Sequence, residues 1–140
     1  MTAIASTTGI LDTSTVILFE RLDDEELPDE SLITAVTLAE LSVGPLVADD
    51  DLERAARQAR LQQAEADFEP LPFDADAARA FGWVAASLRQ AGRKVQARAY
   101  DAMIAATAIA HLLPLYTVNP TDFEGITGLD LRPLAHPDHH

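Results

Sequence analysis

The sequence contains no cysteine and no long apolar run. Without cysteine the chain can form no disulfide, offers no thiolate ligand to zinc and has no cysteine nucleophile. Its apolar runs are far shorter than the ~20 residues that cross a bilayer. Residues 1–11 carry neither the basic nor the apolar segment of a secretory signal. We therefore expect a cytoplasmic protein without a membrane segment.

Positive charge is also scarce. The chain has 10 Lys and Arg against 23 Asp and Glu, for a net charge of −13 at pH 7. A chain this acidic is a poor general binder of nucleic acid, whose phosphates attract Lys and Arg. Half of the basic residues, however, lie between Arg79 and Arg98, in a segment that contains no acid. The sequence thus predicts one local basic surface on an acidic protein.

The remaining composition is that of an ordinary globular chain, with 140 residues of which 48% are hydrophobic. We expect a single domain over residues 1–134 and a flexible tail at 135–140. Strand-like and helix-like segments alternate, which predicts an α/β fold: a three-layer α/β/α sandwich around a mainly parallel sheet of four to five strands. The expected strands are 9–12, 31–36, 68–73, 115–118 and 129–134, and the expected helices are 13–21, 37–45, 49–66, 74–90 and 98–112.

Four acids occupy positions where an acid is unexpected. Asp12 follows the first strand, and Glu40 lies between the apolar residues of TLAEL. Asp101 opens the apolar helix YDAMIAATAIA, and Asp122 lies in VNPTDF, just beyond the fourth strand. Strand ends and helix starts of an α/β sheet converge at one edge, where such folds bind ligands. We therefore expect the four carboxylates to meet in one pocket.

A pocket of this kind favours a metal ion. Buried carboxylates must be paired, protonated or bound to a cation, and no Lys or Arg lies within these four motifs. A hard cation such as Mg²⁺, or Mn²⁺ in its place, prefers oxygen ligands. A metal held by carboxylates can activate water and stabilise the charge of a phosphodiester. The set predicts metal-dependent phosphodiester hydrolysis.

Each acid alone also has an ordinary structural explanation. Asp12 suits the N-cap of the helix that follows it, and Asp101 suits the first turn of its own helix. Glu40 can lie on a solvated helix face, and Asp122 can form an Asx turn. The hypothesis of a site therefore depends on the set and not on any single member.

Four motifs together resemble those of PIN-domain ribonucleases. They are ILDTSTVI, TLAEL followed by Gly44, YDAMIAATA and YTVNPTDFEGI. Their order and spacing are most similar to the toxin subunits of VapBC toxin–antitoxin pairs, and the resemblance covers nearly the whole chain. Any one motif is weak, whereas the four in this order are specific.

The resemblance implies a PIN-like fold, an acidic Mg²⁺ or Mn²⁺ site, cleavage of RNA and neutralisation by a cognate VapB-like antitoxin. It also implies a homodimer. Asp12 and Asp101 would be direct metal ligands, whereas Glu40 and Asp122 would hold metal-bound waters or a second ion. Three further residues would support the site: Thr13 or Ser14 by a hydrogen bond to a ligand carboxylate or metal-bound water, and Asn119 by shaping the turn that presents Asp122.

The basic segment supplies candidate contacts to RNA phosphates, namely Arg89, Arg93, Lys94 and Arg98. The alternative is a solvated basic face. Phe81 and Trp83 are expected to pack in the core rather than to stack on bases, and His111 is expected to be a hydrogen-bonded structural histidine.

Competing functions are less compatible with the sequence. A haloacid-dehalogenase-type phosphatase needs a second aspartate where this chain has Ser14, and a receiver domain needs an early acidic pair and a late lysine. Lys94 is the only lysine, and no acidic pair precedes Asp12. The remaining alternative is a catalytically silent PIN-like module that binds RNA or protein. The motifs do not encode which RNA is the target.

Overall fold

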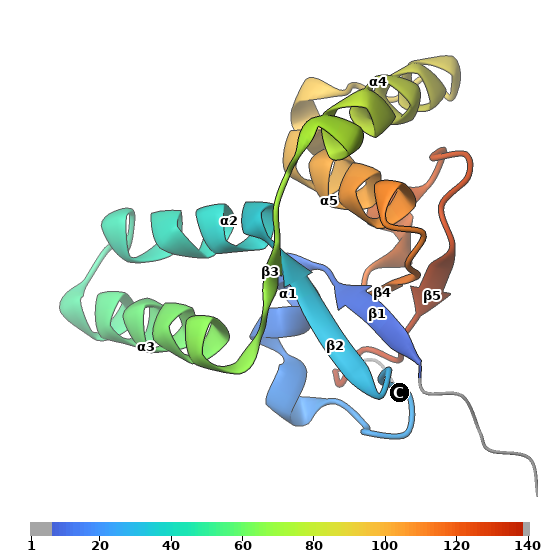
Figure 1. Cartoon of the computed structure of the whole chain (residues 1–140). Helices are drawn as coiled ribbons and strands as arrows, with labels where there is room; N and C mark the ends of the chain where they lie inside the picture. The colour runs from blue at the N-terminus through green and yellow to red at the C-terminus, as the bar shows by residue number, and fades with distance from the viewer. Residues whose placement is uncertain (1–6, 139–140) are drawn as a thin grey trace, which may run out of the picture.

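The computed structural model describes residues 7–138. Its centre is a five-stranded sheet in the order β3-β2-β1-β4-β5, and every pairing is parallel (Figure 1). The strands are β1 (Thr8–Leu11), β2 (Glu30–Thr34), β3 (Pro70–Leu71), β4 (Leu115–Thr117) and β5 (Leu131–Pro133). The predicted parallel α/β fold is confirmed.

Helices cover both faces of this sheet and form an arm beside it. The arm consists of α2 and α3, which lie side by side at the left of Figure 1. The helices are α1 (Thr13–Ile17), α2 (Ala35–Leu46), α3 (Asp51–Asp67), α4 (Ala75–Gln90) and α5 (Ala99–Ala110), with 3₁₀ turns η1 (Phe19–Arg21), η2 (Gln96–Arg98) and η3 (Pro120–Phe123). No helix within residues 7–138 is long and apolar enough to cross a membrane.

The central strand β1 is buried on both faces, as is typical of parallel sheets. Successive strand residues point to opposite sides, so Ile10 and Leu11 enter different core clusters. Leu11 packs with Val16 of α1 and Ala64 of α3, whereas Ile10 packs with Ile104 of α5. The sheet therefore separates α1 and α3 from α5, which gives the expected three layers.

Helix α4 lies outside α5 and does not reach the sheet core. Its buried residues Ala77, Val84 and Leu88 recur with helical spacing, and the last two pack against Ala102 and Ala106 of α5. Trp83 precedes Val84 by one position, which turns its side chain away from α5, and it is 80% exposed. The expectation that Trp83 packs in the core was wrong, because only one stripe of α4 is covered.

The predictions for Phe81 and His111 differ in outcome. Phe81 is partly buried in the α4–α5 cluster and meets Phe73 edge to face, with ring centroids 6.4 Å apart. His111 follows α5 as its C-cap residue, and its Nε2 atom is buried without a hydrogen-bond partner among the described residues. The expectation that His111 is fully hydrogen-bonded was therefore wrong.

Several element boundaries differ from the predicted ones for local reasons. The first helix ends at Ile17 and continues as the separate turn η1, since its residues are mostly β-branched or hydroxylated and are modest helix formers. Strand β2 ends at Thr34, whose hydroxyl caps α2 by accepting from the Thr37 amide, so α2 starts at Ala35. Strand β3 shrinks to Pro70–Leu71 at the sheet edge, where proline is tolerated.

Helix α2 was expected to end at Gly44 and Pro45. It runs past both residues to Leu46. Carbonyl groups near this end accept hydrogen bonds from arginines of α3. Arg57 Nη1 donates to the Gly44 carbonyl at 2.9 Å, and Arg54 Nε donates to the Pro45 carbonyl at 3.3 Å. Side chains of α3 thus complete the end of α2 and hold the arm together.

The described part of the tail contacts the body of the protein. The Ala135 amide donates to Glu26 Oε2 at 3.0 Å, and Asp138 forms an ion pair with Arg21. The predicted flexibility of residues 135–140 stays a prediction, and residues 139–140 lie outside the described residues.

A tight contact in the sheet leads to the first prediction. A Cβ atom added at Gly9 would lie 2.3 Å from Cε1 of Tyr116 on β4, a buried ring with little room to move. We expect Gly9→Ala to lower the free energy of unfolding by about 1–3 kcal/mol. Denaturant unfolding followed by circular dichroism measures this change.

The matched control is Gly82→Ala in α4, where an added Cβ meets no atom within 4 Å. Alanine is the better helix former, so this variant should gain about 0.5–1 kcal/mol. Equal stability of the two variants would contradict the packing around Gly9.

Candidate active site

The four predicted acids lie on four separate elements around one end of the sheet. Asp12 follows β1, Glu40 lies in α2, Asp101 in the first turn of α5, and Asp122 in η3 after β4. Strand β1 pairs with β2 on one side and with β4 on the other, so the strand order reverses direction at β1. Ligands of parallel sheets bind at such a reversal, outside the carboxyl ends of the strands.

Asp12 is the most buried of these acids, with 1% of its surface exposed. One carboxylate oxygen accepts from the amide and the hydroxyl of Thr15, which makes Asp12 the N-cap of α1. The other oxygen accepts from the Thr117 hydroxyl at 2.9 Å and the Ser14 hydroxyl at 3.3 Å. Burial raises the pKa of Asp12, and these hydrogen bonds offset part of that rise.

The hydroxyls that bind Asp12 are themselves held by the backbone after β4. Thr15 Oγ1 accepts from the Val118 amide at 3.1 Å, and Thr117 Oγ1 accepts from the Asn119 amide at 2.9 Å. Each hydroxyl accepts one bond and donates another to the carboxylate. The ends of β1 and β4 are therefore joined through Asp12, which has a defined orientation.

Glu40 is brought to the site by α2 and held by a residue of α1. Thr13 Oγ1 donates to Glu40 Oε1 at 2.6 Å and lies 3.1 Å from the hydroxyl oxygen of Thr37, which is fully buried. Burial raises the pKa of Glu40, the hydrogen bond from Thr13 lowers it, and repulsion by Asp12 adds to the rise. Glu40 is thus not on a solvated helix face.

The pKa of Asp101 is raised by burial and by the other three acids of the site. Among the described residues, no side chain or amide donates a hydrogen bond to its carboxylate. Its pKa is raised to about 7, first by burial and then by repulsion from Asp122, Glu40 and Asp12, whereas Arg98 opposes the rise. The carboxylates on four elements are therefore close enough to repel one another.

Asp122 is oriented by a turn and by a cation. Its amide donates to the Asn119 carbonyl at 3.1 Å, so Asn119 shapes the turn that presents it. Arg98 Nη1 donates to Asp122 Oδ1 at 3.0 Å, and both side chains are about one-third exposed. Arg98 is the one cation that forms an ion pair with any of the four acids among the residues described.

The donor set suits a hard divalent cation. It consists of carboxylate oxygens, three of these groups have raised pKa values, and one arginine is too little to balance four acids. Within residues 7–138, no three acidic or histidine side chains already form a metal-binding group. Hydroxyls hold Asp12 and Glu40, and a guanidinium holds Asp122.

The basic segment is only partly free to bind RNA. Arg93 Nη1 donates to the carbonyls of Thr121 and Glu124 at 3.0 and 2.7 Å, which fixes the loop that carries Asp122. Arg98 is paired with Asp122 as described. Arg89 and Lys94 are exposed, and a role for any of these residues in RNA binding stays a prediction.

Three threonines of the site are not among the residues predicted from the sequence: Thr15, Thr37 and Thr117. Thr15 had a local signal, because an N-cap aspartate bonds the residue three positions later. The other two had none. Thr117 reaches Asp12 across 105 positions, and only the pairing of β1 with β4 brings them together.

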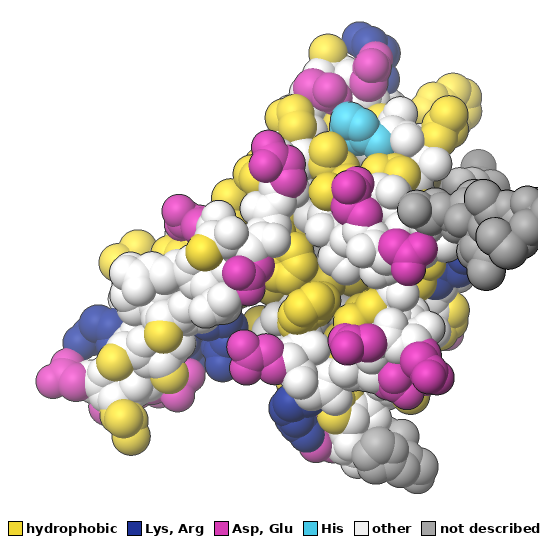
Figure 2. Space-filling model, turned by 60° about the horizontal axis from the view of Figure 1, so that its bottom comes forward, with side chains coloured by type: hydrophobic (Ala, Val, Ile, Leu, Met, Phe, Trp, Pro, Cys, Tyr) yellow, Lys and Arg dark blue, Asp and Glu magenta, His cyan; other side chains and the backbone are white. Residues whose placement is uncertain are grey.

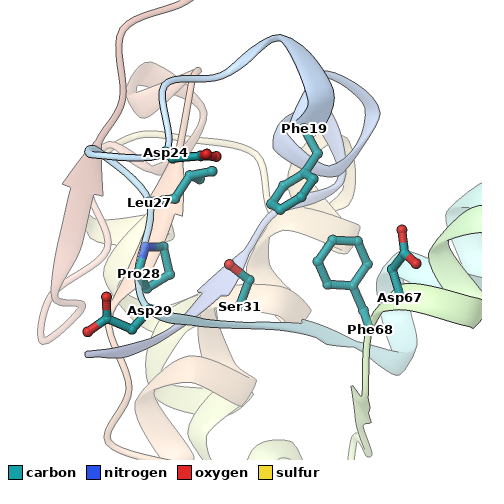
Figure 3. Close-up of a pocket in the computed structure, with 8 residues that line it drawn as sticks. All are labelled: Phe19, Asp24, Leu27, Pro28, Asp29, Ser31, Asp67 and Phe68. Carbon is teal, nitrogen blue, oxygen red and sulfur yellow. The ribbon is translucent and has the colours of Figure 1, made fainter. Parts of the chain in front are cut away.

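A separate hollow of about 500 Å³ lies at the opposite end of β2, beside Ser31. Figure 3 shows its three acids: Asp29 points away from the hollow, while Asp24 and Asp67 lie on different sides of it. Asp29 also accepts a hydrogen bond from the Thr7 amide at 3.0 Å. These acids do not converge, so this hollow has no resemblance to the carboxylate site.

Comparison with known sequences identifies one family. Residues 10–127, which include all four acids, match the model of the PIN domain. Ribonuclease VapC5 of Mycobacterium tuberculosis is 43% identical over 123 residues, covering 86% of this chain and 88% of that protein. Ribonuclease VapC1 of Rickettsia felis is 27% identical over 133 residues, covering 92% and 98%.

Solved structures share the whole fold. A chain of VapBC-5 from Mycobacterium tuberculosis, a member of the VapBC family of toxin–antitoxin systems, matches with a TM-score of 0.78 at 38% identity, covering 91% of this chain and 99% of its own. A chain of DNA-bound VapBC from Salmonella typhimurium matches with a TM-score of 0.70 at 27% identity, covering 92% and 98%.

The crowding around Asp101 predicts a pH-dependent instability of the metal-free protein. The folded state holds this proton up to a pH of about 7, whereas an unfolded chain releases it near pH 4. The folded state therefore loses stability as pH rises between these values. At about pH 8 in EDTA, Asp101→Asn should be more stable than the wild type by roughly 1–2 kcal/mol, after allowance for solvent screening.

Urea unfolding of both proteins between about pH 4 and pH 8 measures the effect. The stability difference should shrink toward the acidic end, where Asp101 is protonated in both states. A difference that stays constant over this range would show that Asp101 titrates normally.

Proposed function

The chain belongs to the PIN domain family, and we propose that it is a metal-dependent ribonuclease and the toxin of a type II toxin–antitoxin pair. The observation that carries the proposal is the meeting of four carboxylates, from four elements, at the carboxyl end of the central strand. The 43% identity to Ribonuclease VapC5 supports the same activity for this chain.

Mg²⁺, with Mn²⁺ as a substitute, is the proposed metal. Asp12 and Asp101 would hold it directly, and Glu40 and Asp122 would hold its waters or a second ion. When bound, the metal would supply positive charge for the phosphate and a more acidic water. To bind it, the carboxylates would exchange some of their hydroxyl and guanidinium donors for the ion.

The side chains of the site have separable roles in hydrolysis. Thr15 and Thr117 keep the Asp12 carboxylate in one orientation, and Thr13 does the same for Glu40. One of the four carboxylates would take the proton of the attacking water as the water oxygen bonds to phosphorus. The bond from phosphorus to the leaving ribose oxygen then breaks, and that oxygen acquires a proton.

A protein partner is part of the proposal. The solved neighbours are VapBC systems, which supports a VapB-like antitoxin as the partner here. The net charge of −13 would attract a basic inhibitory segment. Figure 2 shows acidic side chains scattered over one face of the molecule, with few basic ones among them.

A homodimer and a cytoplasmic location are also proposed. Large apolar side chains are exposed where α2 meets α3, and a protein neighbour would cover such a surface. They are Val43, Leu46, Val47 and Leu52, which are 45–84% exposed.

The proposal is tested by RNA cleavage with purified, antitoxin-free protein in Mg²⁺, in Mn²⁺ and in EDTA. Asp12→Asn keeps the size of the side chain but removes its charge at the centre of the site. We expect this variant to lose cleavage by on the order of 100-fold or more, and EDTA to abolish cleavage by the wild type.

The matched control is Asp49→Asn, which removes the same charge from an exposed position before α3. It should cleave as the wild type does. Cleavage that is equal in Asp12→Asn and wild type would indicate a contaminating nuclease. RNA binding in EDTA, together with no cleavage in Mg²⁺ or Mn²⁺, would favour the catalytically silent binding module instead.

A further inference from the structure

The loop that carries Asp122, residues 119–127, packs against the C-terminal end of α4. A Cβ atom placed on Gly125 of this loop would lie only 2.8 Å from the Cβ atom of Ala91, the residue that caps α4. Ile126 is partly buried in the apolar cluster between α4 and α5. Helix α4 does not reach the sheet core (Figure 1), yet its end supports one of the four acids.

The end of α4 has a backbone geometry that fixes the direction of Arg93. Gly92 has a φ of +77°, which glycine adopts without strain, and its amide donates to the Arg89 carbonyl at 3.0 Å. The Arg93 amide donates to the Leu88 carbonyl at 2.9 Å. These two bonds form a Schellman motif. Arg93 therefore leaves the helix in a defined direction, toward the loop.

The side chain of Arg93 ties this loop together on both sides of Asp122. Its Nη1 donates to the carbonyls of Thr121 and Glu124, at 3.0 and 2.7 Å. The side chain is only 19% exposed, whereas the Glu124 carboxylate is 69% exposed and lies 3.9 Å from Nη1. The two carbonyls are therefore the main partners of this guanidinium, and hydrogen bonds from a charged donor are strong ones.

Two arginines hold Asp122 in different ways. Arg98 Nη1 donates to the carboxylate of Asp122 at 3.0 Å, whereas Arg93 holds only the backbone on either side of it. A cation that binds Asp122 would displace Arg98 from the carboxylate but would leave the bonds of Arg93 intact. The loop can therefore stay in place while the carboxylate of Asp122 changes its partner.

We propose that Arg93 is a positioning residue of the reaction, which fixes the loop of Asp122 on α4 and so keeps this carboxylate beside the other acids. The inference rests on the proposed ribonuclease function, and it makes Arg93 a support of the metal site instead of a contact to RNA phosphates. Groups that orient metal-binding carboxylates without touching the metal typically contribute about 10- to 100-fold to metal affinity or activity.

The first test measures metal binding without RNA. Arg93→Gln removes the charged donor, and Arg79→Gln is the matched control, because Arg79 is exposed on the same helix and pairs with Asp76 there. Binding of Mn²⁺ to the purified proteins is measured by electron paramagnetic resonance of the free ion. We expect Arg93→Gln to bind Mn²⁺ about 10-fold more weakly than the wild type, and Arg79→Gln to match the wild type.

Two variants of the loop separate its position from its charge. Gly125→Ala leaves Arg93 unchanged but adds a Cβ atom against Ala91, at a φ of +87° that alanine adopts only with strain. It should weaken Mn²⁺ binding as Arg93→Gln does. Glu124→Gln removes the exposed carboxylate and keeps the backbone carbonyl, so its Mn²⁺ affinity should stay within about two-fold of the wild type.

Cleavage kinetics test the role in the reaction. Arg93→Gln should lower kcat about 10-fold at a fixed Mg²⁺ concentration and leave the KM for RNA nearly unchanged, because Arg93 does not touch the strand. Excess Mg²⁺ should restore part of the rate. Arg93→Lys retains a charged donor for the two carbonyls and should recover part of the Mn²⁺ affinity. Thermal unfolding of each variant checks that the fold is intact.

The other outcomes overturn the inference in distinguishable ways. If Arg93→Gln keeps its Mn²⁺ affinity but binds a short single-stranded RNA in EDTA more weakly than Arg79→Gln does, Arg93 is a phosphate contact. If Arg93→Gln is only less stable and binds Mn²⁺ and cleaves RNA as the wild type does, its bonds to the loop are structural. In both cases the proposed function stands. If the wild type neither binds Mn²⁺ nor cleaves RNA, the proposed function fails and the positioning role fails with it.

Discussion

The hydrogen-bonded clamp around Asp12 is the interaction on which the candidate site depends. A buried carboxylate at the end of the central strand would be unstable alone, and the protein surrounds it with four donors. Two of the hydroxyls are fixed in turn by backbone amides after β4. These hydrogen bonds cap α1, join β1 to β4 and fix the position of the Asp12 carboxylate within the site.

The other three carboxylates lie close enough to like charges for repulsion to affect the site. Glu40 is held by Thr13 and Asp122 by Arg98, while the pKa of Asp101 is raised by burial and by repulsion from its neighbours and is only partly lowered by Arg98. Such crowding destabilises the folded state at neutral pH unless a proton or a cation compensates. Under the proposed function, the same unbalanced negative charge would attract a divalent cation.

In an acidic protein proposed to act on RNA, only a few Lys and Arg side chains are free to bind phosphates. Most arginines here serve the structure: Arg54 and Arg57 complete the end of α2, and Arg93 holds the loop of Asp122. Because most arginines form contacts within the protein, few remain for a general nucleic-acid-binding surface. Under the proposed function, the acidic surface would be available to a basic protein partner.

The sequence by itself determined the alternation of strands and helices, the edge at which the acids gather and the four acids themselves, because these follow from local periodicity, caps and motif order. The capping of α1 by Asp12 was also readable, since it spans three residues. Tertiary structure decided the rest. Thr117 meets Asp12 only because the strand order places β4 beside β1. Arg98 meets Asp122 because η2 and η3 both lie against α5. Trp83 is exposed although it lies in an amphipathic helix, because periodicity shows which residues share a face but not how much of that face a neighbour covers.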